Sequence, residues 1–163
     1  MEHIIKNLIH VEHFPKSNVV YKDISRIIEL NFSELIEHML ELTKDTLANA
    51  DYIAGVESRG FIFASAMAYA TKKGFIMIRK SGKLPPPTIR KSYSLEYGNA
   101  EIEMKSGTGN IIVVDDILAT GGTILAAKEL AEHAGYNVLG LFTAFNLKEL
   151  NNLDDQVKYL INI

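Results

Sequence analysis

The segment that most constrains the fold is residues 111–123, IIVVDDILATGGT. Ile111 to Val114 are four β-branched residues, apolar on both faces, which is typical of a central strand in a parallel sheet. Asp115 and Asp116 follow at the carboxyl end of this strand, and a loop of small residues then leads into a helix expected over 124–134. This order of strand, paired acids, loop and helix predicts one repeat unit of an α/β fold.

Apolar patterns elsewhere predict further strands and helices that alternate along the chain. We expect strands at 52–56, 75–78 and 138–145, helices at 31–47 and 61–73, and a hairpin of 92–97 with 101–104. Asn31 and Glu34 would form a capping box, Gly135 would end the helix that begins at 124, and Gly98 with Asn99 would turn the hairpin. Such alternation predicts an α/β fold with a central, mostly parallel sheet flanked by helices, where ligands bind beyond the carboxyl ends of the strands.

Length and composition favour a single domain over 1–163, since 47% of the residues are apolar and 23% are charged. The net charge of -3 argues against a broad surface for nucleic acid or anionic lipid. There is no cysteine, which excludes a disulfide scaffold, a thiolate nucleophile and a cysteine zinc site. The first ten residues do not read as a signal peptide, and the apolar runs are too short to span a bilayer, so we expect a cytoplasmic protein without membrane contact.

The loop after the paired acids has the chemistry of a phosphate site. Gly121 and Gly122 have no side chains, so backbone N–H groups can close around an oxyanion, and Thr120 and Thr123 add hydroxyl donors. The helix that follows directs its positive end at the same point. The paired acids can accept hydrogen bonds from ribose hydroxyls or bind the water shell of Mg²⁺. The alternative is a solvated acidic turn followed by a flexible glycine linker.

A second loop repeats this logic. The strand at 52–56 leads into Glu57, Ser58, Arg59 and Gly60 and then into a helix, and the Arg59 guanidinium offers a bidentate fork for phosphate oxygens. The alternative is an ordinary surface cation that pairs with Glu57.

A third segment, RKSGKLPPPTIRKSYSLEYG, contains three of the four prolines and reads as a long mobile loop. The first thirteen residues of this segment contain five cations, namely Arg79, Lys80, Lys83, Arg90 and Lys91. In a chain of negative net charge they form a local anion site, for which pyrophosphate with Mg²⁺ is a suitable ligand. The alternative is a solvated charged loop.

VVDDILATGGT resembles the 5-phosphoribosyl-1-diphosphate (PRPP) motif of the type I phosphoribosyltransferases. YIAGVESRGFIFASAMAY, GKLP and SYSLEYG resemble the adenine branch of that family, and the resemblance extends from Phe14 through Phe142. It implies the type I phosphoribosyltransferase fold, with an N-terminal hood at about 10–30 and a flexible hairpin loop at about 80–104. It also implies a homodimeric, Mg²⁺-dependent enzyme that makes AMP and pyrophosphate from adenine and PRPP.

The resemblance further implies roles for single residues. Asp115 and Asp116 would hold the ribose hydroxyls and the magnesium waters, and Ala119, Thr120, Gly121, Gly122 and Thr123 would hold the 5′-phosphate. Glu57, Ser58, Arg59, Arg79, Lys80 and Lys83 would bind pyrophosphate, with a cis peptide between Glu57 and Ser58 and with the Arg79 region reaching the partner subunit's site. Tyr93 to Gly98, including Tyr97, would fold over PRPP, and Glu96 would be the general base for adenine. The alternative for Glu96 is a cross-strand surface acid.

The segment that contains Val20, Tyr21 and Lys22 resembles the family's base-binding hood. Tyr21 would stack on adenine and Val20 would read its amino edge through the backbone, whereas the alternative is a core or surface aromatic. Lys22 stands where the family usually has arginine, and Lys cannot reproduce a bidentate guanidinium. Two other functions stay open: a 6-oxopurine enzyme, against which SYSLEYG argues, and a PRPP-sensing regulator that binds nucleic acid, which would need a broad basic face.

Overall fold

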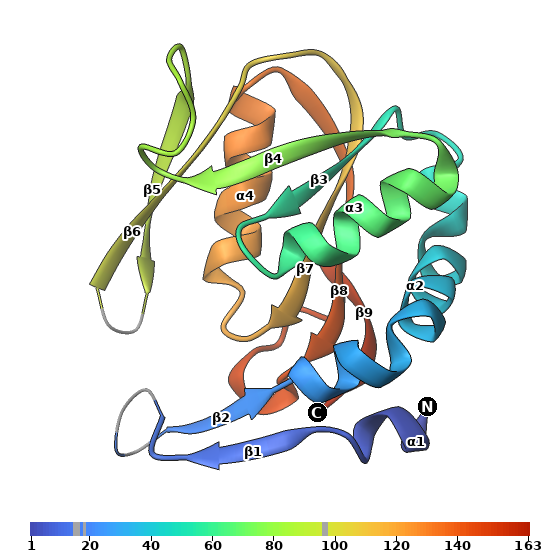
Figure 1. The fold of residues 1–163 in the computed structure, drawn as a ribbon. Helices are drawn as coiled ribbons and strands as arrows, with labels where there is room; N and C mark the ends of the chain where they lie inside the picture. Colours follow the sequence, from blue (N-terminus) through green and yellow to red (C-terminus); the bar gives the residue numbers. More distant parts are fainter. Residues whose placement is uncertain (15–16, 18, 96–97) are drawn as a thin grey trace. The chain divides into compact units, whose positions relative to one another are not determined.

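The structure, a computed structural model, describes residues 1–163 except 15, 16, 18, 96 and 97 (Figure 1). The chain forms two compact units, 1–38 and 39–163. None of the helices among the described residues is long and apolar enough to cross a membrane.

The first unit contains a short helix, a β-hairpin and the start of a long helix. Its elements are α1 (Glu2–Ile5), β1 (Ile9–Glu12), β2 (Val20–Asp23) and the first part of α2 (Ser25–Leu47), and β1 pairs antiparallel with β2. Asp23, the last residue of β2, stabilises the start of α2, because its Oδ1 accepts hydrogen bonds from the backbone N–H and the hydroxyl of Ser25 at 2.9 and 2.6 Å.

The helix predicted to start at Asn31 is joined to a preceding helical segment, so that α2 as a whole begins at Ser25. Asn31 lies at the kink between the two segments, where its φ of -128° is not helical, and its side chain accepts a hydrogen bond from Asn7 at 2.9 Å. Glu34 does not form the predicted capping box, since its carboxylate bonds to the ring of His3 at 2.8 Å. The sequence signal at Asn31 therefore marks a break in a longer helix.

The second unit is built on a seven-stranded sheet with the order β5-β6-β4-β3-β7-β8-β9. Its strands are β3 (Tyr52–Val56), β4 (Gly74–Lys80), β5 (Ile89–Leu95), β6 (Gly98–Met104), β7 (Gly109–Leu118), β8 (Tyr136–Asn146) and β9 (Val157–Asn162). The five strands from β4 to β9 in this order are parallel, and the β5–β6 hairpin joins them antiparallel through β6 and β4. The predicted mostly parallel sheet is confirmed.

Two helices cover opposite faces of this sheet (Figure 1). α4 (Gly122–His133) packs on the face of Ala54, in one apolar cluster with Ala127 and Leu130. α3 (Gly60–Thr71) covers the other face, where a Cβ on Gly55 would lie 2.8 Å from Cβ of Ala64. Because successive strand residues point to opposite faces, Ala54 of β3 faces α4 and the adjacent Gly55 faces α3.

Several boundaries differ from the sequence expectation. Gly98 and Asn99, predicted to turn the hairpin, belong to β6 and pair with Leu95 and Ser94. β7 continues through both aspartates to Leu118, since β8 pairs with it that far, whereas its pairing with β3 ends at Val114. The 3₁₀ helix η1 (Lys148–Leu150) and strand β9 had no strong sequence signal.

Candidate active site

An open pocket of about 120 Å³ lies at the carboxyl end of β7, at the loop that leads into α4. Its lining consists of Asp115, Ile117, Leu118, Ala119, Thr120, Gly121, Gly122, Thr123 and Ile124. The residues predicted for the ribose phosphate thus come together in one place, with Asp116 as the exception.

The loop that forms this pocket depends on a left-handed glycine. Gly121 has a φ of 86° and directly precedes α4, and a Cβ on it would lie 2.1 Å from Cδ1 of Leu153. The first turn of a helix leaves backbone N–H groups without helical partners, and the helix dipole makes that end positive. The free backbone N–H groups and the positive end of the helix dipole therefore both favour binding of a phosphate group here.

Asp115 is buried at the edge of the pocket, with an exposed fraction of 9%. Its Oδ1 accepts a hydrogen bond from the backbone N–H of Asp116 at 2.9 Å. Burial raises the pKa of the Asp115 carboxyl well above its ordinary range, and the charge of Asp116 raises it further. A Cβ on Gly60 would lie 2.8 Å from the same Oδ1, so glycine at the start of α3 permits this close approach.

Asp116 pairs with Arg59, which precedes α3. Nε of Arg59 lies 2.5 Å from Oδ2 of Asp116, and the Asp116 side chain is only 8% exposed. The alternative in which Arg59 pairs with Glu57 is therefore not what the structure shows. The peptide bond between Glu57 and Ser58 is cis, as the family resemblance implied.

Glu57 instead holds the end of β4. Its Oε2 accepts hydrogen bonds from Nε of Arg79 at 3.1 Å and from the backbone N–H of Lys80 at 2.9 Å. Burial raises the pKa of Glu57, but these hydrogen bonds outweigh burial and lower the pKa below its ordinary value. Arg79 also donates to the carbonyl oxygen of Lys83 at 3.2 Å, so four of the residues predicted for pyrophosphate form one network.

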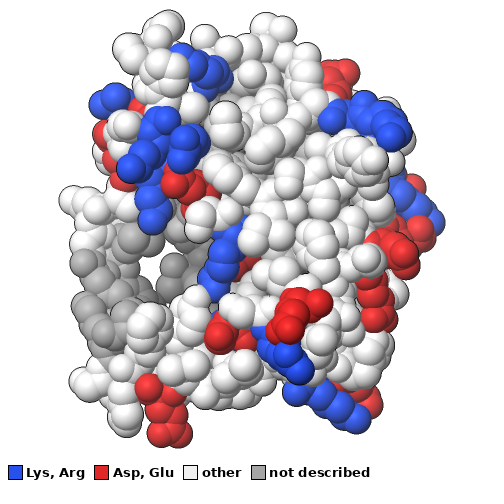
Figure 2. All heavy atoms as spheres, in the orientation of Figure 1, with Lys and Arg blue, Asp and Glu red and all other residues white. Residues whose placement is uncertain are grey.

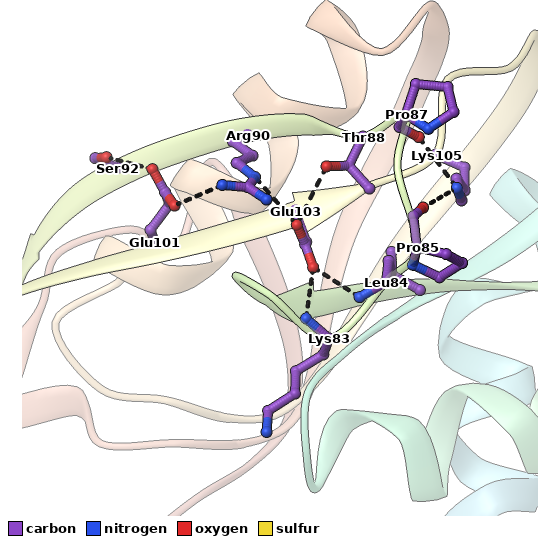
Figure 3. Close-up of polar contacts among 10 residues, drawn as sticks. All are labelled: Lys83, Leu84, Pro85, Pro87, Thr88, Arg90, Ser92, Glu101, Glu103 and Lys105. Carbon is purple, nitrogen blue, oxygen red and sulfur yellow. Dashed lines mark hydrogen bonds and ion pairs between the residues drawn. The ribbon is translucent and has the colours of Figure 1, made fainter.

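A further buried carboxylate, Glu103 on β6, holds the turn between β4 and β5 (Figure 3). Its Oε1 accepts the backbone N–H groups of Lys83 and Leu84 at 2.7 and 2.8 Å. Its Oε2 accepts from the Thr88 hydroxyl and from Nε of Arg90, both at 3.2 Å. The N–H of Leu84 is the main cause that lowers the pKa of Glu103 below its ordinary value, against the opposing effect of burial.

The basic segment around this turn is mostly strand, although the sequence reads as a long loop. β5 pairs with β6 from Ile89 through Leu95, and Lys and Arg side chains gather near the turn (Figure 2). Lys83 lies on the turn that the buried carboxylate organises, and the other four cations lie on the two strands that flank this turn.

The β5–β6 hairpin lies beside the phosphate loop. The Thr123 hydroxyl donates to the Tyr93 hydroxyl at 3.4 Å, and Lys91 pairs with Glu129 of α4 at 2.5 Å. Glu96 and Tyr97 lie outside the described residues, so their roles as base and as part of the hood stay predictions.

The three residues predicted for adenine lie on β2 of the first unit. Val20 is 53% exposed, and Lys22 pairs across the hairpin with His10. Tyr21 makes an edge contact with Phe14, with ring centroids 5.2 Å apart. Their contact with a base stays a prediction.

Comparison with known proteins assigns the chain to a family. The family model for the phosphoribosyl transferase domain matches residues 24–161. The chain is 47% identical over 162 residues to an adenine phosphoribosyltransferase of Bdellovibrio bacteriovorus, covering 96% of this chain and 98% of the relative. This chain belongs to the adenine phosphoribosyltransferase family. It is therefore an enzyme of the pentosyltransferase class.

Other adenine phosphoribosyltransferases agree with this assignment. The protein of Hydrogenovibrio crunogenus is 44% identical, with 87% of this chain and 84% of the relative covered. The crystal structure of the enzyme from Rhodothermus marinus superposes with a TM-score of 0.87 at 32% identity and covers 99% of this chain and 97% of that one. The predicted fold is confirmed.

Two residues next to the predicted sites escaped the sequence analysis. Glu103 alternates with Ile102 in a hairpin, which is the pattern of a solvent-facing acid, yet the turn folds over it and buries it. Asn151 reaches Ala119 of the phosphate loop from 32 residues further along the chain, and no local pattern predicts such a contact.

Proposed function

We propose that this chain transfers the 5-phosphoribosyl group of PRPP to adenine and releases AMP and pyrophosphate. The observation that carries the proposal is the pocket at the end of β7, in which buried Asp115 faces the glycine loop before α4. A sugar phosphate fits this arrangement, with its phosphate on the loop and its hydroxyls on the acids.

Ligands of two related enzymes support adenine as the acceptor. The adenine phosphoribosyltransferase of Saccharomyces cerevisiae, 33% identical to this chain, has been crystallised with adenine and an imino-altritol bisphosphate. The enzyme of Giardia lamblia, 27% identical, has been crystallised with 9-deazaadenine. Both ligand sets favour adenine over a 6-oxopurine.

In the proposed reaction the loop at 119–123 anchors the 5′-phosphate, and Asp115 and Asp116 hold the ribose. Arg59, Arg79 and Lys83 are the cations proposed to bind the leaving pyrophosphate. The bond between the anomeric carbon and the pyrophosphate oxygen breaks, and a bond from that carbon to the imidazole nitrogen of adenine forms. The proton of that nitrogen passes to the Glu96 carboxylate, and the cations stabilise the charge that develops on pyrophosphate.

The residues at this site fit Mg²⁺ held together with the substrate. Asp115 and Asp116 supply carboxylate oxygens, the ligand type that Mg²⁺ prefers. Oδ2 of Asp116 forms an ion pair with Arg59 but no regular hydrogen bond among the described residues, so it can still accept from a metal-bound water. No group of three or more acidic or histidine side chains gathers as a metal site in the described chain. We therefore propose that Asp115 and Asp116 would hold Mg²⁺ together with the substrate and water, and that the ion would supply positive charge to stabilise the leaving pyrophosphate.

We also propose that residues 1–163 form a single catalytic domain and that the protein is a cytoplasmic homodimer. α3 carries no charged residue in its twelve positions and exposes Ile62 (39%) and Tyr69 (79%). The neighbouring strand β4 exposes Phe75 and Met77. Figure 2 shows a wide area over α3 and β4 without charged side chains, and exposed apolar areas of this kind mark protein interfaces.

The proposed function is tested by incubating the purified protein with adenine, PRPP and Mg²⁺ and following AMP by chromatography. We expect AMP and pyrophosphate in equal amounts, and loss of product when EDTA removes the metal. Release of pyrophosphate with free ribose 5-phosphate but no AMP would show that the acceptor is water, and would contradict the proposal.

A further inference from the structure

The segment after β8 supports the phosphate loop from outside the pocket. Asn151 follows η1, and its Nδ2 donates to the carbonyl oxygen of Ala119 at 2.7 Å. Its Oδ1 accepts the backbone N–H of Leu153 at 3.2 Å, and the Leu153 side chain packs against Gly121. Neither Asn151 nor Leu153 lines the pocket. Both residues thus act on the loop from its far side.

Asn151 is held in turn by two more asparagines, at the ends of β8 and β9. Its Nδ2 also donates to Oδ1 of Asn146 at 2.9 Å, and Nδ2 of Asn146 donates to Oδ1 of Asn162 at 2.9 Å. Asn146 is fully buried, with an exposed fraction of 0%. Backbone groups decide the direction of this row. The carbonyl oxygens of Ala119 and Leu147 only accept and the N–H of Leu153 only donates, so the Asn151 NH₂ group must point toward the loop.

The bond to Ala119 also fixes the orientation of the next backbone donor. The peptide between Ala119 and Thr120 is trans, since the cis bonds of the described chain lie at Glu57–Ser58 and Pro86–Pro87. In a trans peptide the C=O and N–H groups point in opposite directions. Since Asn151 takes the carbonyl from outside the pocket, the N–H of Thr120 points away from Asn151, and Thr120 lines the pocket.

We infer that Asn151 is a positioning residue for the 5′-phosphate: it holds the Ala119–Thr120 peptide so that the Thr120 N–H is directed at the bound phosphate. This inference rests on the proposed binding of a ribose phosphate at the loop. Asn151 itself touches no substrate, and its effect passes through a single peptide plane.

The test compares Asn151→Asp with Asn152→Asp, which makes the same change at the adjacent, exposed residue. Asp at 151 keeps the shape and the acceptor for Leu153, but its second oxygen opposes the carbonyl of Ala119. We expect the dissociation constant of ribose 5-phosphate, measured by calorimetry, to rise about ten- to a hundredfold in Asn151→Asp. It should stay within about twofold of the wild type in Asn152→Asp.

A second readout separates positioning from general loss of structure. In Asn151→Asp the KM for PRPP should rise while the KM for adenine stays within about twofold, whereas loosening of the whole fold would change both. Asn151→Ala, which removes the donor without adding charge, decides the matter if the aspartate variant does not fold, with an expected loss of about tenfold.

Ribose 5-phosphate binding within twofold of the wild type, in whichever variant is folded, would overturn the inference and leave the proposed function intact. A wild-type protein that binds no ribose 5-phosphate would overturn the proposed function, and the inference with it.

Discussion

At the scale of single residues, the two consecutive acids at the end of β7 differ in their surroundings. Asp116 faces a guanidinium at 2.5 Å, which compensates its charge. Asp115 has the amide of Asp116 as a donor, but burial raises its pKa well above the ordinary range. Burial therefore favours the neutral form of Asp115 over a wider pH range than in an exposed aspartate, and we expect a magnesium-bound substrate to favour its charged form.

A first prediction concerns the stability of this acid. Because the pKa of Asp115 is raised in the folded protein, the stability that its neutral form contributes is full below the ordinary aspartate pKa. It is lost as the pH rises through the raised value. Asp115→Asn should therefore raise the melting temperature of the ligand-free protein at neutral pH by a few degrees, and the gain should shrink in acid.

Thermal unfolding across a pH series measures this difference, and the variant should bind PRPP weakly because it has lost one charge for the metal waters. A gain that is the same at every pH would show that titration of Asp115 is not its cause.

A second prediction concerns Glu103. Glu103→Gln keeps one acceptor oxygen, but its amide nitrogen opposes two of the four donors that the carboxylate now accepts. We expect the melting temperature to fall by several degrees and the affinity for pyrophosphate to fall about tenfold, since the turn carries Lys83 and braces Arg79.

Glu101→Gln is the matched control, because Glu101 lies two residues away on the same strand with a side chain that is 40% exposed. Equal effects of the two substitutions on pyrophosphate binding would contradict the role given to the buried acid.

At the scale of elements, the local sequence was sufficient to predict a strand, loop or helix where the residues of that segment alone determine its conformation. Ile111 to Val114 are apolar on both faces and Gly121 lacks a Cβ, so strand, loop and helix could be predicted without tertiary information. β9 (VKYLIN) carries a weaker pattern, and its place beside β8 is decided by long-range pairing. Helix α2 begins earlier than predicted, because the polar Asn31 resembles a cap but lies at a kink between two helical segments, where its side chain bonds to Asn7.

The candidate site likewise contains residues that the local sequence predicts and contacts that only the folded structure shows. The phosphate loop and the cations are contiguous motifs, so their residues could be named in advance. The partner of Arg59 could not, since Glu57 and Asp116 are equally plausible until the strand ends are placed side by side. Contacts over long separations, such as Asn151 with Ala119, depend on the sheet order alone.

A third prediction tests the loop before α4. Gly121→Ala places a Cβ in a left-handed conformation and 2.1 Å from Leu153, whereas Gly82→Ala meets the same backbone penalty in open space. We expect both substitutions to destabilise the protein, Gly121→Ala by more than about 1 kcal/mol beyond Gly82→Ala.

Chemical denaturation measures the stability difference, and binding of ribose 5-phosphate measures the effect on the site. Only the substitution at 121 should weaken this binding. Unchanged binding in Gly121→Ala would show that the loop conformation is not what holds the phosphate.

At the scale of the whole molecule, the proposed subunit interface makes a fourth prediction. Tyr69→Glu places a carboxylate in the last turn of α3, at the edge of its uncharged face, where the tyrosine is 79% exposed and the fold itself should tolerate the change. We expect a shift from dimer to monomer in sedimentation experiments, because a charge in an apolar interface must be desolvated.

Gln156→Glu, at an exposed position outside α3 and β4, controls for the added charge and should leave the dimer intact. A Tyr69→Glu protein that sediments as the wild-type dimer would place the interface elsewhere.

The central claim is that the chain attaches adenine, and no other base, to the ribose phosphate of PRPP. The most direct measurement gives the protein Mg²⁺, PRPP and equal amounts of adenine, hypoxanthine, guanine and uracil, and identifies the nucleotides formed by mass. We expect AMP in large excess, with adenine consumed in step with pyrophosphate release. IMP or GMP as the main product would contradict it.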